Sequence, residues 1–567
     1  MRPDFQDELE IQATDEVKIM ENEVLTITYE GKEEKTIEEL IPNGKNFCFV
    51  RAEIENRLRE LSYVVKGPVT IKLFKLAGDT ESMYIYKNTL RYVVSMAVRN
   101  VLPDVSVKFS NDISRSIYVR ASEPSKFKIN TLLIAEIEKE IQRLIDADLP
   151  IKKRLITKKE AIAQYKAVNM EDKLDILAYR SEQMVHQYVC GDYFDYMYGY
   201  MMPSTGYIHT FKILPKMPGF LVQFPRAEFK GQIPPFTRET VFERTLEASR
   251  KWSALVGLST IADVNDTVRN LGSTDFIMMS EAHHSNQLAE LGLQIVNSPS
   301  EIKLICIAGP SSSGKTTFAN RLRLELLSLG INPIRLSVDD YYLPKVDMIK
   351  EPDGSVDLES IKAFDVQLFN QDMLKLIEGE KVTIPAYDFK TGSRHPGRTL
   401  QLAEGQPIIV EGIHALNEQL TNLIPKHEKF KIFIAPQAQI NVDDHTPISL
   451  TDLRLLRRIV RDAKFRHSSA EETLDMWPSV RKGEFTWIYS TQESADYVFN
   501  SLLPYELCVM REHAMPLLSQ VKKTSKHYVT CRRLINFLKY FEKVDENNVP
   551  DNSLMREFIG GSCFRDV

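Results

Sequence analysis

The sequence predicts an α/β protein whose C-terminal part is a doubly wound parallel sheet, preceded by two smaller α+β domains. Apolar runs of strand character alternate with helix-like segments at 302–308, 334–338, 407–411 and 430–434. This alternation is typical of parallel strands joined by crossover helices. A glycine-rich loop, GPSSSGKTT at 309–317, follows the first strand and opens a helix. Strand, glycine loop and helix in this order predict a phosphate-binding site.

Upstream of the sheet the elements are shorter. Three β-like runs, LTITYEG, NFCFVRAEI and TIKLFKL, lie between Val24 and Lys75 and predict one compact α+β module. A larger unit follows, with a helical run at 90–102, a β-like region at 105–119 and a helix at 129–147. Residues 226 to about 300 read as mostly helical, and Thr237 is the expected N-cap of a helix over 238–256.

Composition describes an ordinary globular chain without targeting signals. With 567 residues, three or four domains are expected. The net charge of −6 gives no electrostatic reason to expect nucleic acid or a membrane surface as partner. The N-terminus is acidic and lacks an apolar core, and no run is long enough to span a membrane, so we expect a cytoplasmic protein. Six scattered cysteines without a C-x-x-C pair predict neither disulfides nor a zinc site.

The first 225 residues resemble the N-terminal region of threonyl-tRNA synthetases, a ubiquitin-like TGS module followed by a metal-dependent editing module. The resemblance rests on RYVVSMAVRNVLPDVSV at 91–107 and GDYFDYMYGYMMPSTG at 191–206. The positions that match the metal ligands of the synthetases are Asn88, Tyr92, Met197 and Met201. These side chains do not form a Zn²⁺ site. We therefore expect the editing chemistry to be absent and a scaffold for binding or regulation to remain.

The glycine loop carries the clearest chemistry. Its residues, expected to bind the phosphates of ATP, are Gly309, Pro310, Ser311, Ser312, Ser313, Gly314, Lys315, Thr316 and Thr317. The glycines let backbone N–H groups point at the phosphates, and the helix behind them contributes its positive N-terminal end. Lys315 supplies a mobile positive charge, and the Thr316 hydroxyl suits Mg²⁺.

The ends of two later strands place carboxylates at the same edge of the sheet. The strand at 334–338 ends at Asp339, which could take a proton from an attacking hydroxyl group. The strand at 407–410 ends at Glu411, which suits Mg²⁺. The alternative for either acid is a helix cap or a solvated strand end.

An arginine stripe follows in DLRLLRRIVRDAKFR at 452–466. Arg454, Arg457, Arg458 and Arg461 share one helix face at i, i+3, i+4 and i+7. Such a stripe is usually a solvated face with salt bridges. Beside a triphosphate site it suits the charge that develops on the transferred phosphoryl group, and a helix that swings over the site would exclude water.

The loop, together with SVDDYY, PAYDFKTGSR, IIVEGIHAL and RLLRRIVRDAKFR, resembles the uridine/cytidine kinase branch of the phosphoribulokinase–uridine kinase family over about 300–520. The resemblance implies Asp339 as general base and Mg²⁺ ligand, with Thr316 and Glu411 as the other metal ligands. It implies Arg466 on the phosphates and Lys315, Arg458 and Arg461 in catalysis. It places the following around the nucleoside: Asp339, Tyr342, Asp365, Tyr387, Phe389, Arg394 and Arg458.

Two departures from the family pattern concern the base. A histidine and an arginine that read the pyrimidine in the family are matched here by Gly392 and Ser468. We expect ATP- and Mg²⁺-dependent phosphorylation of a nucleoside 5′-hydroxyl, with uridine or cytidine first. The alternatives are another small hydroxyl substrate, such as a purine nucleoside or a sugar phosphate, and a nucleotide-dependent regulator that binds RNA or tRNA. Homo-oligomerisation is left open, and Gly560-Gly561 has no functional interpretation.

These arguments divide the chain into six parts: a flexible N-terminus at 1–20, a TGS-like domain at 21–77, an editing-like domain at 78–225, a helical connector at 226–299, a P-loop nucleoside kinase domain at 300–545 and a tail at 546–567.

Overall fold

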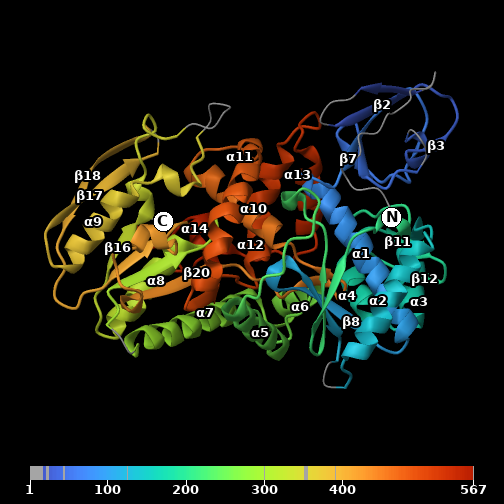
Figure 1. The fold of residues 1–567 in the computed structure, drawn as a ribbon. Coiled ribbons are helices and arrows are strands. Elements are labelled where there is room, and N and C mark those ends of the chain that lie inside the picture. The colour runs from blue at the N-terminus through green and yellow to red at the C-terminus, as the bar shows by residue number, and fades with distance from the viewer. Residues whose placement is uncertain are drawn as a thin grey trace.

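The computed structural model describes residues 17–20 (backbone only), 24–41, 45–123, 126–298, 301–349, 356–389 and 391–565. Figure 1 shows the first sheet and the helices around α1 on one side and the P-loop sheet on the other, with α10, α12 and α13 between them. Most of the flexible segment expected at 1–20 lies outside the described residues, and its last four residues form strand β1 (Val17–Met20).

The first sheet is antiparallel throughout, in the order β1-β2-β7-β4-β5. Its further strands are β2 (Leu25–Tyr29), β4 (Phe49–Ile54), β5 (Arg57–Arg59) and β7 (Val69–Lys75), with β3 (Lys35–Thr36) and β6 (Val64–Val65) as a separate pair. The α+β expectation is wrong for this module as described, because residues 24–41 and 45–75 contain a single 3-10 turn at Glu38–Leu40 and no α-helix. Ile41 is already extended, as expected of a residue before proline, here Pro42.

The second unit is built around a long buried helix, α1 (Thr80–Val101). This helix begins ten residues before the predicted run because the Asp79 carboxylate accepts a hydrogen bond from the Ser82 amide and caps it. Around it lie β8 (Val107–Asn111), β9 (Ile117–Ala121), α2 (Thr131–Asp146), β10 (Lys152–Thr157), α3 (Lys158–Ala167), α4 (Glu171–Ala178), β11 (Met184–Cys190), β12 (Tyr193–Asp195), β13 (Lys212–Lys216) and β14 (Gly219–Gln223). One hydrophobic core runs from Leu25 to Ala227 through both units.

Three helices form the connector: α5 (Thr240–Leu255), α6 (Ile261–Asn270) and α7 (Ser273–Val296). The Thr237 cap is wrong. Glu239 stands at the N-cap position of α5 without a side-chain cap, while the Thr237 amide donates to the Ser114 hydroxyl at 3.0 Å. The segment before α5 is thus held by a tertiary contact that the local sequence does not show.

The C-terminal sheet is parallel, in the order β16-β19-β15-β20-β23. Its strands are β15 (Leu304–Ala308), β16 (Ile334–Ser337), β19 (Ile408–Glu411), β20 (Lys429–Ala435) and β23 (Tyr497–Asn500). The first four confirm the predicted strands, and β23 was not predicted. Alternate residues enter two different cores, Ile305 and Ile307 on one face and Leu304 and Cys306 on the other. Both faces are therefore covered, as a doubly wound sheet requires.

The remaining elements surround this sheet. They are α8 (Lys315–Ser328), α9 (Val366–Ile377), the hairpin β17 (Val382–Asp388) and β18 (Ser393–Leu400), the pair β21 (Asn441–Asp443) and β22 (Thr446–Pro447), α10 (Leu450–Phe465), α11 (Ala470–Gly483), α12 (Glu506–Ser519), α13 (Tyr528–Leu538) and α14 (Arg556–Ile559). No helix in the described part of the chain combines the length and apolarity that a membrane crossing needs.

Candidate active site

The glycine loop joins β15 to α8 in the geometry that phosphate binding requires. Ser312 and Gly314 have positive φ angles of 59° and 92°, which turn successive N–H groups toward one concave side. A side chain at Gly309 would collide with the carbonyl oxygen of Ile434 on β20. The Lys315 ammonium group donates to the carbonyl oxygens of Gly309 at 3.0 Å and Pro310 at 3.3 Å. The lysine side chain is therefore held by two carbonyl groups of its own loop.

Several hydroxyl groups of the loop have nothing to bind within the described residues. The side-chain oxygens of Ser312, Ser313 and Thr317 are buried without a hydrogen-bond partner there. Buried hydroxyl groups in native proteins are normally paired, so an unpaired cluster indicates a ligand with acceptor oxygens. The phosphates of a nucleotide fit this set, because they accept hydrogen bonds from hydroxyl and N–H groups alike.

Two arginines of the predicted stripe support the loop from α10. Arg454 is buried in an ion pair with Glu484 and donates to the Ser311 carbonyl oxygen at 2.9 Å. Arg457 is buried in an ion pair with Glu506 at 2.5 Å and donates to the Ser312 carbonyl at 3.4 Å. These two arginines thus pack one end of α10 against the loop, and a swing of the helix over the site stays a prediction.

The other arginines converge on a single acid. Arg458, Arg461 and Arg466 lie 3.1, 3.4 and 3.4 Å from the carboxylate of Asp462, which is fully buried. Arg458 also donates to the Ser311 hydroxyl at 2.8 Å. Burial lowers the pKa of Arg458 and of Arg466. Three cations therefore share one anion beside the loop, which leaves an excess of positive charge for phosphates.

Asp339 follows directly on β16, in the turn Val338–Tyr341, and Glu411 ends β19. The pKa of Asp339 is raised by burial, against the opposing effect of Lys315, Arg466 and Arg461. Burial, and secondly the charge of Asp339, raises the pKa of Glu411 to about 7. The Asp339 carboxylate has no hydrogen-bond partner within the described residues. A carboxylate with a raised pKa and no hydrogen-bond partner is suited to accept a proton from an attacking hydroxyl group.

Two acids at this site were missed by the sequence argument. Glu359 is half-buried, and burial, followed by the charge of Glu484, raises its pKa to about 7. Glu557, on α14, accepts a hydrogen bond from the Thr317 amide at 3.1 Å. Neither belongs to a motif or follows a strand of the parallel sheet, so no local signal in the sequence could have identified them.

An aromatic wall stands next to Asp339. The ring centroids of Tyr342 lie 5.3 Å from Tyr387 and 5.6 Å from Phe389, and the Phe389 side chain is 61% exposed. Asp365 caps α9 and forms an ion pair with Arg394 at 2.9 Å. The structure therefore brings together the aromatic residues predicted to face the nucleoside. Asp365 and Arg394, in contrast, are bound to each other.

The two positions where the family has base-reading cations are now located. Gly392 has a φ of 65° and lies at the turn of the β17–β18 hairpin, where the side chain of Lys345 comes within 3.0 Å of the position that a Cβ would take. Ser468 donates its amide to the Asp462 carbonyl at 3.1 Å, just after α10. The aliphatic stem of the exposed Lys345 thus packs at the first of the two positions.

The side chains at the positions aligned with the synthetase metal site are engaged in packing and in hydrogen bonds to the backbone. The Asn88 amide donates to the Tyr198 carbonyl at 3.0 Å, and the Tyr92 hydroxyl donates to backbone carbonyls of β11 and β12. Met197 and Met201 are buried in the core. Throughout the described residues, no three His, Cys, Asp or Glu side chains are grouped so that they could hold a metal ion.

Comparison with known proteins agrees with this geometry. The model of the phosphoribulokinase/uridine kinase family matches residues 304–506. A uridine kinase of Ureaplasma parvum serovar 3 is 30% identical over 177 residues, which cover 31% of this chain and 77% of that protein. A uridine kinase of Borrelia duttonii is 32% identical over 199 residues, covering 35% of this chain and 85% of that protein.

The N-terminal region has a relative of another kind. A threonine–tRNA ligase of Hahella chejuensis is 27% identical over 165 residues, which cover 29% of this chain and 25% of that protein. The resemblance noted in the first 225 residues is thus found again by direct comparison. From its glycine loop to α12, the chain belongs to the phosphoribulokinase/uridine kinase family.

Proposed function

We propose that this chain transfers the γ-phosphoryl group of ATP to the 5′-hydroxyl group of a nucleoside, with uridine and cytidine as the first candidates. One observation carries the proposal. The phosphate loop with its unpaired hydroxyl groups lies beside Asp339, an acid without a hydrogen-bond partner in the described residues, and an aromatic wall follows it directly. A phosphoryl donor site, a base and an aromatic surface for an acceptor are the parts that such a transfer needs.

In this phosphoryl transfer each group of residues has a separate role. The aromatic wall holds the nucleoside so that its hydroxyl group points to Asp339, which accepts the proton. Lys315 leaves the loop carbonyls and contacts the phosphates, while Arg458, Arg461 and Arg466 balance the charge that develops on the equatorial oxygens.

Mg²⁺ fits the same site. Two carboxylates, Asp339 and Glu411, and the Thr316 hydroxyl supply the oxygen donors that this ion prefers, and the substrate phosphates normally complete its coordination. When bound, the ion neutralises phosphate charge and orients the transferred group. Glu411 must lose its proton to bind the ion, and the positive charge of the ion favours this ionised form.

The acceptor is identified by incubating the purified chain with ATP, Mg²⁺ and a panel of nucleosides and sugar phosphates, and by determining product masses. Uridine or cytidine monophosphate is the expected product, with Lys345 replacing the cation absent at Gly392. Product from a purine nucleoside or a sugar phosphate alone would move the assignment to that acceptor. Bound ATP without any product would contradict the proposal and favour a nucleotide-dependent regulator.

Glu557 provides a prediction about ATP affinity. Its carboxylate occupies an amide in the first turn of α8, where backbone N–H groups otherwise bind phosphate oxygens. Glu557→Gln removes a negative charge from this point, and we expect KM for ATP to fall by about threefold to tenfold with kcat unchanged. Glu546→Gln, in the same tail but paired with His513, is the matched control and should leave KM unchanged. A higher KM in Glu557→Gln would show that the carboxylate supports nucleotide binding instead.

For the N-terminal half, we infer an editing-like scaffold at 78–225 without its metal chemistry, after a TGS-like module at 21–77. Four side chains at the metal-ligand positions support this inference: Asn88, Tyr92, Met197 and Met201. Each of them packs in the core or donates a hydrogen bond to the backbone. The limits 226–299 for the connector, 300–545 for the kinase domain and 546–567 for the tail stay predictions.

A further inference from the structure

A large cavity is lined by residues that are distant in the sequence from the phosphate loop. Its volume is 1090 Å³, and it is enclosed by α1, β5 and the segment around Tyr198 on one side and by α10, α12 and α13 on the other. No residue of the loop 309–317 lines it. The cavity thus belongs jointly to the synthetase-like half and to the C-terminal half, and it is a site separate from the one described above.

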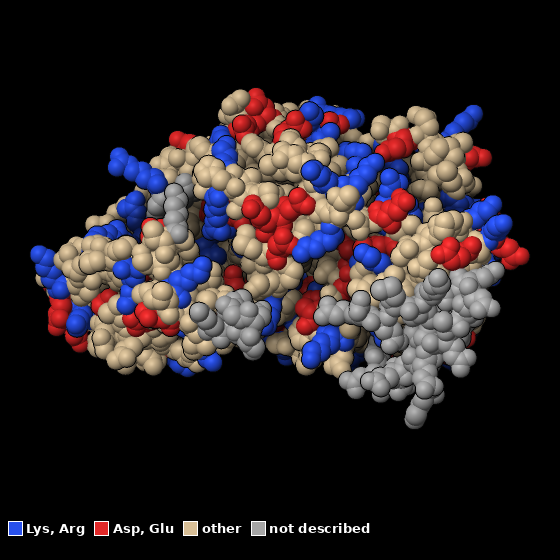
Figure 2. Space-filling view, turned by 90° about the horizontal axis from the view of Figure 1, so that it is seen from above, with Lys and Arg blue, Asp and Glu red and all other residues tan. Residues whose placement is uncertain are grey.

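The lining is strongly basic although the whole chain is acidic. Eleven Lys and Arg side chains line the cavity against three Asp and Glu side chains, while the chain carries a net charge of −6. Figure 2 shows Lys and Arg side chains together with Asp and Glu side chains over the middle of one face of the molecule. Concentration of one charge in a cleft of low-dielectric walls raises the local concentration of ligands of opposite charge.

Two of these cations, the buried Arg91 and the half-buried Lys87, form no ion pair within the described residues. Arg91 is 2% exposed, donates to the His445 carbonyl at 2.7 Å and to Asn88, and its Nε is buried without a partner. Lys87 lies one turn before it on α1, 5.1 Å from the ring centroid of Tyr84, and forms no ion pair within the described residues. Burying a cation without an anion is costly, so the protein keeps these charges at a cost that an anionic ligand would offset.

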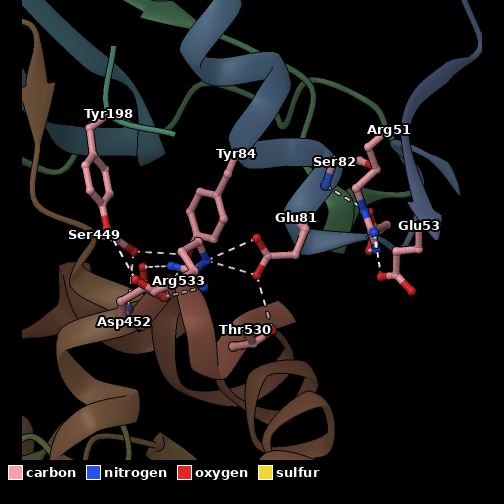
Figure 3. A network of polar contacts seen from close by, with 11 residues as sticks. Arg51, Glu53, Glu81, Ser82, Tyr84, Tyr198, Ser449, Asp452, Thr530 and Arg533 are labelled. Atoms are coloured by element: carbon pink, nitrogen blue, oxygen red, sulfur yellow. Dashed lines mark hydrogen bonds and ion pairs between the residues drawn. The ribbon is translucent and has the colours of Figure 1, made fainter. Parts of the chain in front are cut away.

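The floor of the cavity is held rigid by a network from three helices. Arg533 of α13 binds Glu81 of α1 at 3.0 Å and Asp452 of α10, as Figure 3 shows. The Tyr84 hydroxyl adds contacts to Ser449 at 3.0 Å and to Asp452 at 3.2 Å. Two of the three lining acids are thus ion-paired with Arg533, and neither forms an ion pair with Lys87 or Arg91.

Aromatic rings line the same cavity as the cations. Seven of the 22 tyrosines of the chain line the cavity, among them Tyr84, Tyr198, Tyr200 and Tyr540. Stacking on such rings is worth about 1–3 kcal/mol per base and tolerates any base, because every base has a π-face. Cations without an ion pair beside partly exposed tyrosine rings therefore match a ligand that carries both phosphate and base.

We propose that this cavity binds a nucleoside phosphate, with its phosphate groups on Lys87 and Arg91 and its base against the tyrosines. The cavity is slightly larger than the roughly 300–1,000 Å³ of ordinary small-molecule pockets, so a nucleotide with several phosphates fits inside it. A free nucleotide and the end of an RNA strand both carry phosphate and base, so both match the lining of the cavity. The negative net charge favours the free nucleotide, because a long strand would have to cross an acidic surface.

A ligand in this cavity would also affect the phosphate loop, because α10 contacts both. Ser449 and Asp452, in the first turn of α10, line the cavity, and two residues further along Arg454 holds the Ser311 carbonyl of the loop. A ligand that attracts Arg533 or displaces Asp452 acts on the helix that positions the loop. We expect occupancy to change KM for ATP by at least twofold.

The test uses the full-length chain and equilibrium dialysis with four separate labelled probes: ATP, UTP, GTP and a pentaribonucleotide. Binding is compared in wild type and in Lys315→Met, which weakens the phosphate loop, and the variants Lys87→Met, Arg532→Ala and the control are each made in the Lys315→Met background. Lys87 and Arg532 form no ion pair in the described part of the chain, so the loss of either charge leaves no buried acid unpaired. Lys166→Met, on the exposed face of α3, is the matched control.

We expect at least one probe to bind in Lys315→Met, and to bind at least tenfold more weakly in Lys87→Met and Arg532→Ala than in Lys166→Met. Free nucleotides as the binding probes identify a nucleotide site, and the pentaribonucleotide alone identifies an RNA end. The proposal is overturned if no probe binds in Lys315→Met, or if the Lys87 and Arg532 variants bind as the control does. Circular dichroism melting curves that match wild type exclude misfolding of the variants.

The pH dependence gives a second readout. Burial, and secondly the charge of Arg91, lowers the pKa of Lys87 to about 7, with Arg226 and Arg533 acting in the same direction and Asp452 opposing them. Lys87 is therefore charged below pH 7 and loses its charge as pH rises. We expect the affinity of the binding probe to fall above pH 7 by up to about tenfold per pH unit. Lys87→Met should lack this fall, and an identical pH profile in the two proteins would contradict the role of Lys87.

Discussion

Asp339→Asn is expected to lower kcat by about 10²–10⁴-fold while the Kd for ATP stays within a factor of two of wild type. Asparagine keeps the size and one oxygen of the carboxylate but cannot accept the proton of an attacking hydroxyl group. The Asp339 carboxylate has no hydrogen-bond partner in the described part of the site. Burial raises its pKa, and the positive charges of Lys315, Arg466 and Arg461 oppose this rise. Steady-state kinetics with the identified acceptor and calorimetric titration of ATP measure the two quantities.

Asp340→Asn is the matched control for this variant. The neighbouring carboxylate accepts a hydrogen bond from the Tyr387 backbone, which the amide oxygen of asparagine can still accept. We expect its kcat to remain within about tenfold of wild type. If Asp339→Asn retained full turnover, or if Asp340→Asn lost as much, Asp339 would not be the general base.

Arg457→Met is expected to lower the free energy of unfolding by about 3–5 kcal/mol. The guanidinium group and the Glu506 carboxylate are each 1% exposed, and the arginine also donates to the Ser501 carbonyl at 2.8 Å. Removing the arginine leaves Glu506 buried without its cation, and the Ser312 carbonyl of the phosphate loop loses a donor. Urea unfolding followed by circular dichroism measures the loss.

The double variant Arg457→Met/Glu506→Gln separates the unpaired charge from the lost packing. Glutamine is neutral and still accepts the hydrogen bond from the Leu503 amide, at 3.1 Å in the native protein. We expect it to recover about 1–3 kcal/mol relative to the single variant, because a neutral amide costs less to bury than a lone carboxylate. A single variant within 1 kcal/mol of wild type would show that Arg457 is dispensable to the fold.

The arginine stripe shows how far sequence reasoning extends. The spacing of Arg454, Arg457, Arg458 and Arg461 correctly predicted one helix, since periodicity is a local property. The spacing does not show that the first two arginines are bound by Glu484 and Glu506 and support the loop. Their partners lie 30 and 49 residues further along the chain, so only tertiary packing assigns them.

The nucleoside-facing residues show the same division. The sequence placed Tyr342, Tyr387 and Phe389 together through a family resemblance, and the structure brings their rings within 6 Å of one another. It gave no hint of Lys345 beside Gly392, because that contact depends on the turn of the hairpin against the loop after β16. The roles of these residues remain predictions for the acceptor panel to decide.

By itself the sequence determined the parallel sheet, the phosphate loop and the acids at two strand ends. These features are set by hydrophobic period, glycine spacing and the rule that parallel strands end at one edge, all of which act over short stretches. Only the tertiary structure placed the Glu557 carboxylate on the Thr317 amide, 240 residues away, and enclosed a basic cavity between α1 and α13. Such contacts depend on which distant surfaces pack together, and burial then decides which of their charges are paired and which are left for a ligand.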